Sequence, residues 1–183
     1  MSVNKKSNPK LVAALVKKMS AKRGLQIDLG GGGRPQPGFL NVDIRDLATV
    51  DVVQDFEKFP WCLPDECAET VMASHLLEHI NPAGGIFLRF MDEVWRIMKP
   101  GGKFMISLPY AGSPGYWQDP THCNGCNERT WAYFDPLAHG GGLYQIYFPK
   151  PWAIIYNTWD VNGNMEVVLE KRKDDKSYKP ANV

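Results

Sequence analysis

The stretch LQIDLGGGG at residues 25–33 restricts the possible folds more than any other part of the sequence. A short apolar run that stops at glycine is typical of a buried strand. Four consecutive glycines exceed the needs of a turn, and glycine loses more chain entropy on folding than any other residue. They therefore predict a loop whose backbone lies close to a ligand, directly after a strand.

The other apolar segments alternate between strand and helix patterns. Runs at residues 39–44 and 50–56 repeat the design of the first strand, each with an aspartate at or near its end. Residues 9–22 and 84–99 carry apolar side chains at the 3.6-residue period of a helix. Further strands are expected at residues 69–76, 103–109, 151–160 and 164–172, and a short helix at residues 127–134.

This alternation predicts an α/β fold, with a mostly parallel sheet and helices on both faces. The dipeptide Asn162-Gly163 predicts a C-terminal hairpin that adds an antiparallel strand. Each of the two long helices should bury an apolar stripe and leave its charged side chains for solvent. The stripe of the first is Leu11, Val12, Leu15, Val16 and Met19, and the solvent side of the second is Arg89, Asp92, Glu93 and Arg96.

Length and charge limit the class of protein. The chain has 183 residues, which suits one domain, and 21 Lys and Arg residues balance 20 Asp and Glu residues. Such a balance gives no electrostatic footprint for nucleic acid or an anionic membrane. No apolar leader or membrane span is evident, and four cysteines are too few for a disulfide framework. We expect a single cytoplasmic domain over residues 1–183, with flexible ends at residues 1–8 and 173–183.

The glycine loop lacks the features of a phosphate-binding loop. A dinucleotide fingerprint needs a helix after the glycines and an acidic residue about 20 positions on. Asp43 comes only 13 positions after Gly30, and prolines between them leave room for about a turn of helix. No Gly-Lys-Ser/Thr follows, as it would in a P-loop. A close backbone beside carboxylates suits instead a nucleoside that carries an amino acid.

Six short motifs follow one another between residues 27 and 122. They are IDLGGGG (27–33), NVDI (41–44), VVQDFEKFPW (52–61), ASHLLEHI (73–80), MKPGG (98–102) and DPTH (119–122). In this order they resemble class I S-adenosylmethionine-dependent methyltransferases, in the subgroup with Leu-Glu-His after the fourth strand. The resemblance covers residues 25–135 and fits the terminal hairpin. It implies a Rossmann-like sheet in the order 3-2-1-4-5-7-6, with strand seven antiparallel, and S-adenosyl-L-methionine as cofactor.

The resemblance also implies roles for side chains at the ends of the strands. Asp28 and the glycine loop would line the methionine end, and Asp43 would hold both ribose hydroxyls. Ile44 follows Asp43 in the same motif, Asp55 with Phe56 would hold adenine, and residues 74–76 would close over the sulfonium. The expected cofactor-binding residues are Asp28, Gly30, Gly31, Gly32, Asp43, Ile44, Asp55, Phe56, Ser74, His75 and Leu76.

Some of these residues also have simpler interpretations. Asp43 could cap the following turn, and Asp55 could be an ordinary turn residue. Most relatives have a helix between the first two strands, whereas residues 31–40 form only a bridge here. Arg34 in that bridge is expected to supply the positive contact that the helix end would otherwise provide.

Histidines and cysteines leave metal binding as an alternative, although we expect no metal. His75 and His79 stand one helical turn apart, but no third ligand follows Glu78 in the metalloprotease arrangement. A single CxxC without a partner pair is weak evidence for a metal site. The second candidate set is His122, Cys123 and Cys126, with Cys62 or Cys67 as a fourth ligand.

Methyl transfer to a hydroxyl requires a base that accepts a proton near neutral pH, which suits histidine. We expect His122 to be this base, with Asp119 orienting its ring, and His79 is the alternative. Residues 74–77 lack the Asn/Asp-Pro-Pro-aromatic pattern of amino-group methylation, so we expect a small-molecule or sugar acceptor and not nucleic acid. Aromatic side chains are expected at the mouth of the pocket: Trp61, Tyr110, Tyr116, Trp117, Trp131 and Tyr133.

A protein of another class is the alternative. It would bind the cofactor without turnover, as an accessory subunit of a methylating complex. The aromatic loop at residues 110–134 would then be a surface for a partner.

Overall fold

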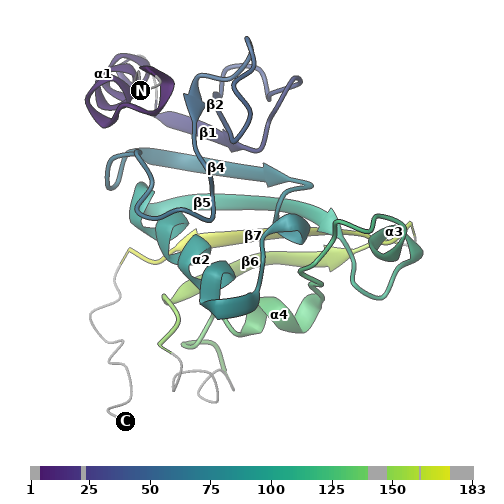
Figure 1. The fold of residues 1–183 in the computed structure, drawn as a ribbon. Coiled ribbons are helices and arrows are strands. Elements are labelled where there is room, and N and C mark those ends of the chain that lie inside the picture. The colour runs from purple at the N-terminus through teal and green to yellow at the C-terminus, as the bar shows by residue number, and fades with distance from the viewer. Residues whose placement is uncertain (1–4, 22–23, 140–147, 161, 174–183) are drawn as a thin grey trace.

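The protein is built on one seven-stranded sheet, seen in a computed structural model that describes residues 5–21, 24–139, 148–160 and 162–173. The strand order is β3-β2-β1-β4-β5-β7-β6 (Figure 1). β1 to β5 pair in parallel, whereas β7 runs antiparallel to both β5 and β6. The predicted order and the antiparallel C-terminal strand are confirmed. The strands are β1 (Leu25–Leu29), β2 (Leu40–Asp43), β3 (Val52–Val53), β4 (Ala68–Ser74), β5 (Met98–Pro109), β6 (Trp152–Trp159) and β7 (Asn164–Lys171).

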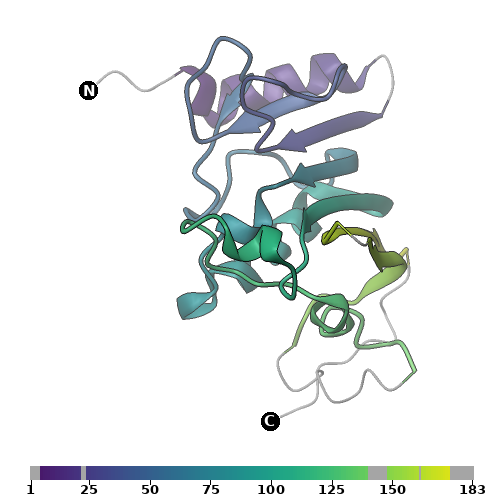
Figure 2. The ribbon, with the colours of Figure 1, turned by 90° about the vertical axis from the view of Figure 1, so that its right-hand side faces the viewer.

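The strand order reverses beside β1, and this reversal positions the functional site. From β1 the chain moves outward to β2 and β3, then returns to the other side of β1 as β4. Ligands of open α/β sheets bind at such a reversal, outside the carboxyl ends of the strands. Figure 2 views the molecule from this edge, where the loop after β5 comes forward. The segments that follow β1, β2, β4 and β5 at this edge are residues 30–39, 44–51, 75–85 and 110–134.

The helices are short. The α-helices are α1 (Pro9–Ser20), α2 (Ile86–Ile97), α3 (Pro114–Trp117) and α4 (Glu128–Ala132). Three 3₁₀ turns accompany them: η1 (Lys5–Ser7), η2 (Leu77–His79) and η3 (Ala83–Gly85). Within the described ranges, none of the helices has the length and apolar character needed to cross a membrane. Parts of the predicted flexible ends, residues 1–4 and 174–183, lie outside the described residues.

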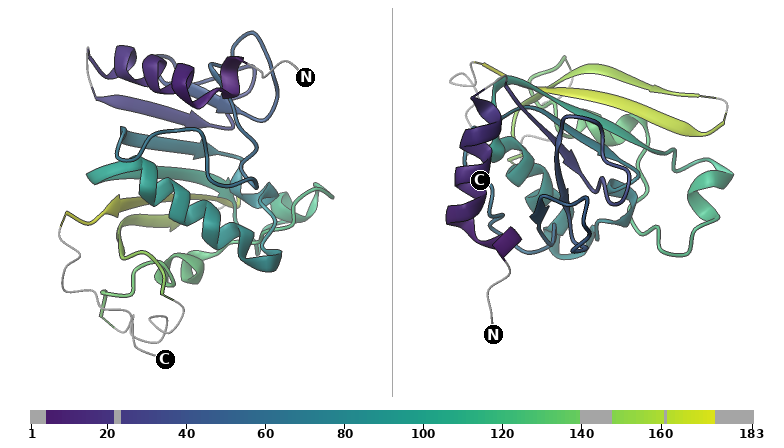
Figure 3. Two further views of the ribbon diagram at one scale, coloured as in Figure 1. Left: turned by 60° about the vertical axis from the view of Figure 1, so that its left-hand side comes forward. Right: turned by 90° about the horizontal axis from the view of Figure 1, so that it is seen from above.

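The two longest described helices, α1 and α2, lie on the same face of the sheet. The sequence predicted helices on both faces. α1 and α2 are on the same side in both views of Figure 3. On β5, Phe104, Ile106 and Leu108 are buried, whereas Met105 points to the opposite face and is exposed. The difference arises because the described connections between β1, β2, β3 and β4 form turns and not crossover helices.

The apolar stripe of α1 is narrower than predicted. Asn8 caps the helix by accepting a hydrogen bond from the Lys10 amide at 3.0 Å. Val12 and Val16 are buried against the sheet, as expected, but Leu11 is half exposed. Leu15 and Met19 are partly buried against the same core, so Leu11 is the residue that departs from the predicted stripe.

Two of the charged residues predicted to face solvent on α2 instead hold the loop before β4. Glu93 Oε2 accepts a hydrogen bond from the Trp61 amide at 2.8 Å. Arg96 Nη1 donates to the Leu63 carbonyl at 2.9 Å and to Asp65 Oδ1 at 2.6 Å. Both side chains are therefore half-buried anchors of a segment that has no regular structure of its own.

The aromatic side chains are distributed between the core and the surface, and only some lie near the site. Trp61 packs edge to face against Phe56 and Phe90, with ring centroids 5.4 and 5.2 Å away, and it is buried. Trp131 is also buried, beneath the sheet, where its Nε1 donates to Met165 Sδ. These two were expected at the pocket mouth and belong to the core, because their rings fill the space between the helices and the sheet.

Candidate functional site

The glycine loop after β1 lies against the segments that follow β2 and β4. Gly30, with φ of 79°, and Gly32, with φ of 52°, adopt left-handed conformations that residues with a Cβ rarely adopt. A Cβ on Gly30 would lie 3.2 Å from a methyl of Leu76, and one on Gly32 would lie 3.5 Å from the Asp43 carboxylate. The fold therefore brings together the residues to which the resemblance gives methionine, ribose and sulfonium contacts.

Asn41 on β2 holds the glycine loop in place. Its Nδ2 donates to the Gly32 carbonyl at 2.9 Å and to the Thr49 carbonyl at 2.8 Å. The Thr49 hydroxyl donates to the same Gly32 carbonyl at 2.7 Å. Asn41 is buried, so these hydrogen bonds connect the loops after β1 and β2 on their side that faces the protein interior.

Gly31 covers two buried oxygen atoms. A Cβ at this position would lie 2.6 Å from Asp28 Oδ2 and 2.7 Å from Asn41 Oδ1. Asp28 Oδ2 accepts a hydrogen bond from the Gln36 amide at 2.7 Å, which folds the bridge back over β1. Burial raises the pKa of the Asp28 carboxyl, although the Gln36 amide works against this shift. Asp28 thus helps to hold the conformation of the loop through a hydrogen bond from the interior side.

Asp43 at the end of β2 is buried and carries a counter-ion. Its Oδ1 accepts hydrogen bonds from the amide and Nε of Arg45 at 2.8 and 3.1 Å. Its Oδ2 accepts one from Arg45 Nη2 at 3.3 Å. Burial alone would raise the pKa of this carboxyl, but the bonds from Arg45 outweigh it and hold the pKa below its usual range. Asp43 therefore presents an ionised carboxylate beside the glycine loop.

The residues expected at the adenine end are arranged unequally. Ile44 is 57% exposed directly after β2, so an apolar side chain is available for stacking. Asp55 forms a turn, in which its Oδ1 accepts from the Glu57 amide at 3.1 Å and its Oδ2 pairs with Lys58 at 3.2 Å. The ring of Phe56 is buried in the core, and its carbonyl accepts a hydrogen bond from Trp61 Nε1 at 3.2 Å. Arg34 is exposed in the bridge between β1 and β2.

The segment after β4 turns sharply toward the glycine loop. His75 has a φ of 51°, and its amide donates to the Ser107 carbonyl at 2.8 Å. Ser74 is exposed, and Leu76 is half buried against Gly30. The loop after β5 fastens η2 from the other side, since Asn124 Nδ2 donates to the Leu77 carbonyl at 3.0 Å. The segment that contains His75 is thereby held between the glycine loop and the loop after β5.

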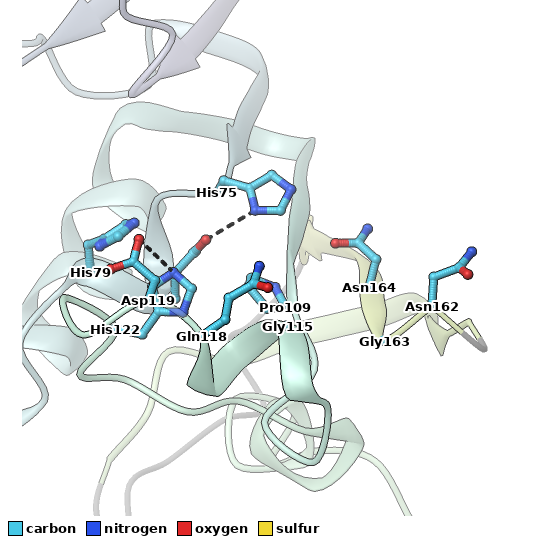
Figure 4. A pocket seen from close by; sticks show the side chains of 11 residues that line it. His75, His79, Pro109, Gly115, Gln118, Asp119, His122, Asn162, Gly163 and Asn164 are labelled. Carbon is cyan, nitrogen blue, oxygen red and sulfur yellow. Dashed lines mark ion pairs between the residues drawn. The ribbon is translucent and has the colours of Figure 1, made fainter.

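A cavity of about 430 Å³ opens beside His75 (Figure 4), and its lining includes no residue of the glycine loop. Polar side chains dominate its lining. They come from the segment after β4, from the loop after β5 and from the turn before β7. The side chains that bear on the chemistry are His75, Glu78, His79, Gln118, Asp119, His122, Asn162 and Asn164.

Hydrogen bonds orient the two inner histidines of the cavity. His122 Nδ1 lies 2.7 Å from the Tyr116 carbonyl, which can only accept, so Nδ1 carries the proton. Thr121 Oγ1 donates to Asp119 Oδ1 at 2.7 Å and therefore accepts from His79 Nδ1 at 3.1 Å. In the neutral rings, both Nε2 atoms then carry the lone pair. The two rings meet edge to face with centroids 4.8 Å apart.

The predicted role of Asp119 has to be changed. Its Oδ2 lies 3.8 Å from His122 Nε2, which is too far for a hydrogen bond. The Tyr116 carbonyl orients His122 instead, and Asp119 acts on His79 through Thr121. Hydrogen bonds from the side chain and amide of Thr121 lower the pKa of the Asp119 carboxyl.

The cysteine-based metal site suggested by the sequence is not formed by the described residues. Their one group of three possible ligands with mutually close atoms is Glu78, His79 and His122, whose ligand atoms lie within 4.8 Å of one another. Cys126 is buried, which raises the pKa of its thiol to about 12, and Cys123 is exposed. The pKa of the Cys123 thiol is also raised, by partial desolvation and by the nearby Glu57 carboxylate, so both thiols remain protonated near neutral pH.

Sequence reasoning missed several residues that shape the site. Asn41 and Arg45 flank Asp43 in the quoted motif, but nothing local shows that one holds the glycine loop and the other covers the carboxylate. The polar Asn41 within an apolar strand was the available signal, because a buried amide needs partners. Glu78, Tyr116 and Thr121 gain their roles only through contacts between the segments after β4 and β5.

Comparisons with known proteins agree with this geometry. Residues 34–106 match a family model described as a methyltransferase domain, and this match begins after the glycine loop. No curated protein matches the chain. A SAM-dependent methyltransferase from Archaeoglobus fulgidus is 17% identical, with a TM-score of 0.56 over 90% of this chain and 95% of that chain.

Two further solved structures resemble the chain. The 1,6-didemethyltoxoflavin-N1-methyltransferase from Burkholderia thailandensis, solved with S-adenosylhomocysteine, is 13% identical, with a TM-score of 0.55 over 91% of this chain and 79% of that chain. The CurJ carbon methyltransferase is 12% identical, with a TM-score of 0.56 over 90% of this chain. The chain spans 53% of that protein, or about half its length.

At these identities the solved structures show the fold, which is the Rossmann-like fold of class I methyltransferases. Together with the domain match over residues 34–106, they support an S-adenosylmethionine-dependent methyltransferase. Their printed names include carbon and ring-nitrogen methyltransferases, so the acceptor has to be inferred from the cavity of this chain.

Proposed function

We propose that the protein transfers a methyl group from S-adenosylmethionine to a hydroxyl of a small polar acceptor, such as a sugar. The observation that carries this proposal is the position of His75. It lies in the segment expected to close over the sulfonium, and its side chain also lines the polar cavity. A donor bound along the glycine loop and an acceptor bound in the cavity would therefore meet at this residue.

The donor site fits a nucleoside better than a pyrophosphate. Gly30 and Gly32 allow close approach of a ligand to the backbone, and no helix N-terminus follows to bind phosphate. Asp43 is buried, ionised and adjacent, which suits the two hydroxyls of a ribose. The exposed side chain of Ile44 would lie against the adenine ring. S-adenosylmethionine supplies a methyl group on a positively charged sulfur.

Arg45 has to move before ribose hydroxyls can bind Asp43. Its side chain is 61% exposed, so solvent screens the ion pair and the guanidinium can leave at low cost. The amide of Arg45 donates to Asp43 Oδ1 from the backbone and can remain in place. Arg45 therefore neutralises the empty carboxylate and gives way to the ligand.

The acceptor cavity favours a small polar molecule. Its volume of about 430 Å³ is sufficient for a sugar-sized ligand. Gln118, Asn162 and Asn164 offer amide donors and acceptors, and histidines line the remaining wall. Such groups bind hydroxyls by hydrogen bonds.

His122 is proposed as the base that takes the proton of the acceptor hydroxyl. Its Nδ1 is committed to the Tyr116 carbonyl, so Nε2 is the atom that can accept a proton. His79 is oriented in the same way through Thr121 and is the second candidate. Asp119 supports His79 more directly than His122.

Binding calorimetry tests the donor site. S-adenosylmethionine and S-adenosylhomocysteine are expected to bind, whereas NAD and ATP are not, because the loop offers no phosphate site. Tight binding of NAD would contradict the proposal.

Turnover tests the acceptor site and the base. Formation of S-adenosylhomocysteine is measured with a panel of small hydroxyl, ring-nitrogen and thiol acceptors, in buffer with a chelator. With a hydroxyl acceptor, His122→Ala should lower turnover by about 10²–10⁴-fold and change donor affinity less than about twofold. His139→Ala is the control, because His139 is exposed and does not line the cavity. A fall in His79→Ala alone would reverse the two roles, and donor binding without turnover on any acceptor would favour the accessory-protein alternative.

A further inference from the structure

Glu78 is a buried carboxylate for which the described residues provide no hydrogen-bond donor. The residue is fully buried, and neither Oε1 nor Oε2 accepts a hydrogen bond. Its nearest charged neighbour is His75, whose Nδ1 lies 3.2 Å from Oε1 and is a cation only when protonated. A buried carboxylate that accepts no hydrogen bond is costly, because nothing replaces the hydrogen bonds from water that it has lost.

This carboxylate faces the same cavity as the lone pairs of two histidines. Glu78, His79 and His122 all line the cavity, and Figure 4 shows the two histidine rings side by side at its wall. One ligand atom from each residue can be chosen so that all three lie within 4.8 Å of one another. The three groups therefore converge from η2 and from the loop after β5.

The hydrogen bonds made by Nδ1 of His79 and of His122 are of the kind found in metal sites. Metal-bound histidine usually donates its second ring N–H to a carbonyl or carboxylate, which fixes the ring and its tautomer. His122 donates from Nδ1 to the Tyr116 carbonyl, and His79 donates to Thr121, which in turn donates to Asp119. Both Nε2 lone pairs are therefore free to bind a cation.

We propose that Glu78, His79 and His122 bind one divalent transition-metal ion, with Zn²⁺ as the first ion to test. Two imidazoles and one carboxylate form a ligand set of catalytic zinc sites, which leave a further position open for substrate. Metal–ligand distances of about 2.0–2.2 Å require the three atoms to approach to about 3.5 Å. The three side chains would have to rotate toward one another to reach this spacing, and a further ligand would enter from the cavity that all three line.

Binding of the cation by these three residues does not depend on the proposed function. The proposal rests on that function only in naming the group that would contact the cation, which is an oxygen of the acceptor. When the cation is bound, His122 Nε2 is a ligand and no longer a base. The proton-accepting role given above to His122 therefore belongs to the cation-free protein. Cysteines take no part, because the group of convergent ligands contains none.

Metal titration of the chelator-treated protein tests this site directly. Zn²⁺ binding is measured by calorimetry, and Co²⁺ binding by its visible absorption, which reports nitrogen and oxygen ligands without thiolate charge transfer. We expect one equivalent of either ion. Glu78→Gln, His79→Gln and His122→Gln should each weaken binding by at least about 100-fold, since loss of a ligand costs at least as much as loss of its support.

Two kinds of control distinguish the site from a surface contact. His139→Gln and Cys123→Ser should bind Zn²⁺ as the original chain does, because both residues are exposed and outside the cluster. Thr121→Val should weaken binding by about 10–100-fold, since it removes the hydrogen bond that orients His79. In the original chain, Zn²⁺ should also raise the melting temperature, a measurement that needs no variant.

S-adenosylmethionine binding, measured on the same samples, separates this proposal from the proposed function. Unchanged Zn²⁺ affinity in Glu78→Gln and His122→Gln, or no binding to the original chain, would overturn the metal site while donor binding persists. Loss of donor binding with normal Zn²⁺ binding would overturn the proposed function alone.

Discussion

At the scale of single residues, Asp43 and Arg45 form an ion pair in which Asp43 is the proposed ligand-binding member. Asp43 is 3% exposed, whereas the side chain of Arg45 is 61% exposed. The same ion pair therefore combines a fixed carboxylate with a movable guanidinium. Substitutions of the two residues should have different effects on the affinity for the donor.

Asp43→Ala should weaken S-adenosylmethionine binding by about 1.5–3 kcal/mol, the range for hydrogen bonds to a charged group. Arg45→Ala should leave the affinity unchanged or slightly higher, because it removes a competitor for the carboxylate. Calorimetry on both variants checks this. Equal losses in the two would show that Arg45 contacts the ligand, and an unchanged affinity in Asp43→Ala would remove Asp43 from the site.

Neighbouring glycines in the loop should differ sharply in their tolerance of a side chain. Gly31→Ala places a Cβ 2.6 Å from Asp28 Oδ2, so the loop must shift. Overpacking of this kind costs about 1–3 kcal/mol of stability and should also lower donor affinity. Gly33→Ala is the matched control, since a Cβ there meets no atom within 4 Å. Thermal unfolding and calorimetry on both variants make the comparison, and similar behaviour of the two would contradict it.

At the scale of elements, α2 does more than cover the sheet. Glu93 and Arg96 hold the irregular segment between β3 and β4, which contains Phe56 and Trp61. This segment also contains Asp55, which is proposed to lie at the adenine end of the site. Glu93 and Arg96, one turn apart on α2, thus hold in place a segment that forms no regular secondary structure of its own.

Arg96→Met should lower the free energy of unfolding by about 1.5–3 kcal/mol, because it removes charge-assisted hydrogen bonds to the Leu63 carbonyl and to Asp65. Arg89→Met on the same helix is the control. Its guanidinium lies 4.4 Å from the centroid of the Phe59 ring, a contact worth about 0.5–1 kcal/mol at an exposed position. Urea unfolding measures both, and a larger loss in Arg89→Met would refute the anchoring role of Arg96.

At the scale of the whole molecule, one core joins α1, α2 and α4 to one face of the sheet. Phe90 on α2 is fully buried and contacts Trp61 and Phe56. Phe87 on the same helix packs edge to face on Phe134 after α4, at 5.8 Å. The segments proposed to bind the donor and the acceptor therefore pack on the same hydrophobic core, and we expect them to unfold together.

Phe90→Ala should lower the free energy of unfolding by about 3–5 kcal/mol, the range for removing a buried phenyl ring. Circular dichroism and tryptophan fluorescence should still report one shared transition. Leu88→Ala, at an exposed position on the same helix, should cost much less. Separate transitions by the two methods would show that the donor and acceptor halves are independent units.

The strands, the glycine loop and the order of the sheet could be predicted because they depend on local patterns. β1 was predicted at residues 25–29 and lies there, since an apolar run stopped by glycine needs no distant information. β3 is only two residues long, where residues 50–56 were expected, because its length depends on pairing with β2. The donor-site residues were likewise found through motifs at strand ends, and their contacts with a cofactor remain a prediction.

The sequence by itself determined which segments form the sheet and which residues with chemical potential stand at its carboxyl edge, because periodicity and turn residues act over a few positions. Only the tertiary structure decided which of those residues are ionised, which are buried and which have hydrogen-bond partners. Glu78 is buried because the amides of Cys123 and Asn124 bind its carbonyl at 2.9 and 3.0 Å, more than 40 positions along the chain. Burial and hydrogen-bond partners depend on such distant segments, and no local pattern records them.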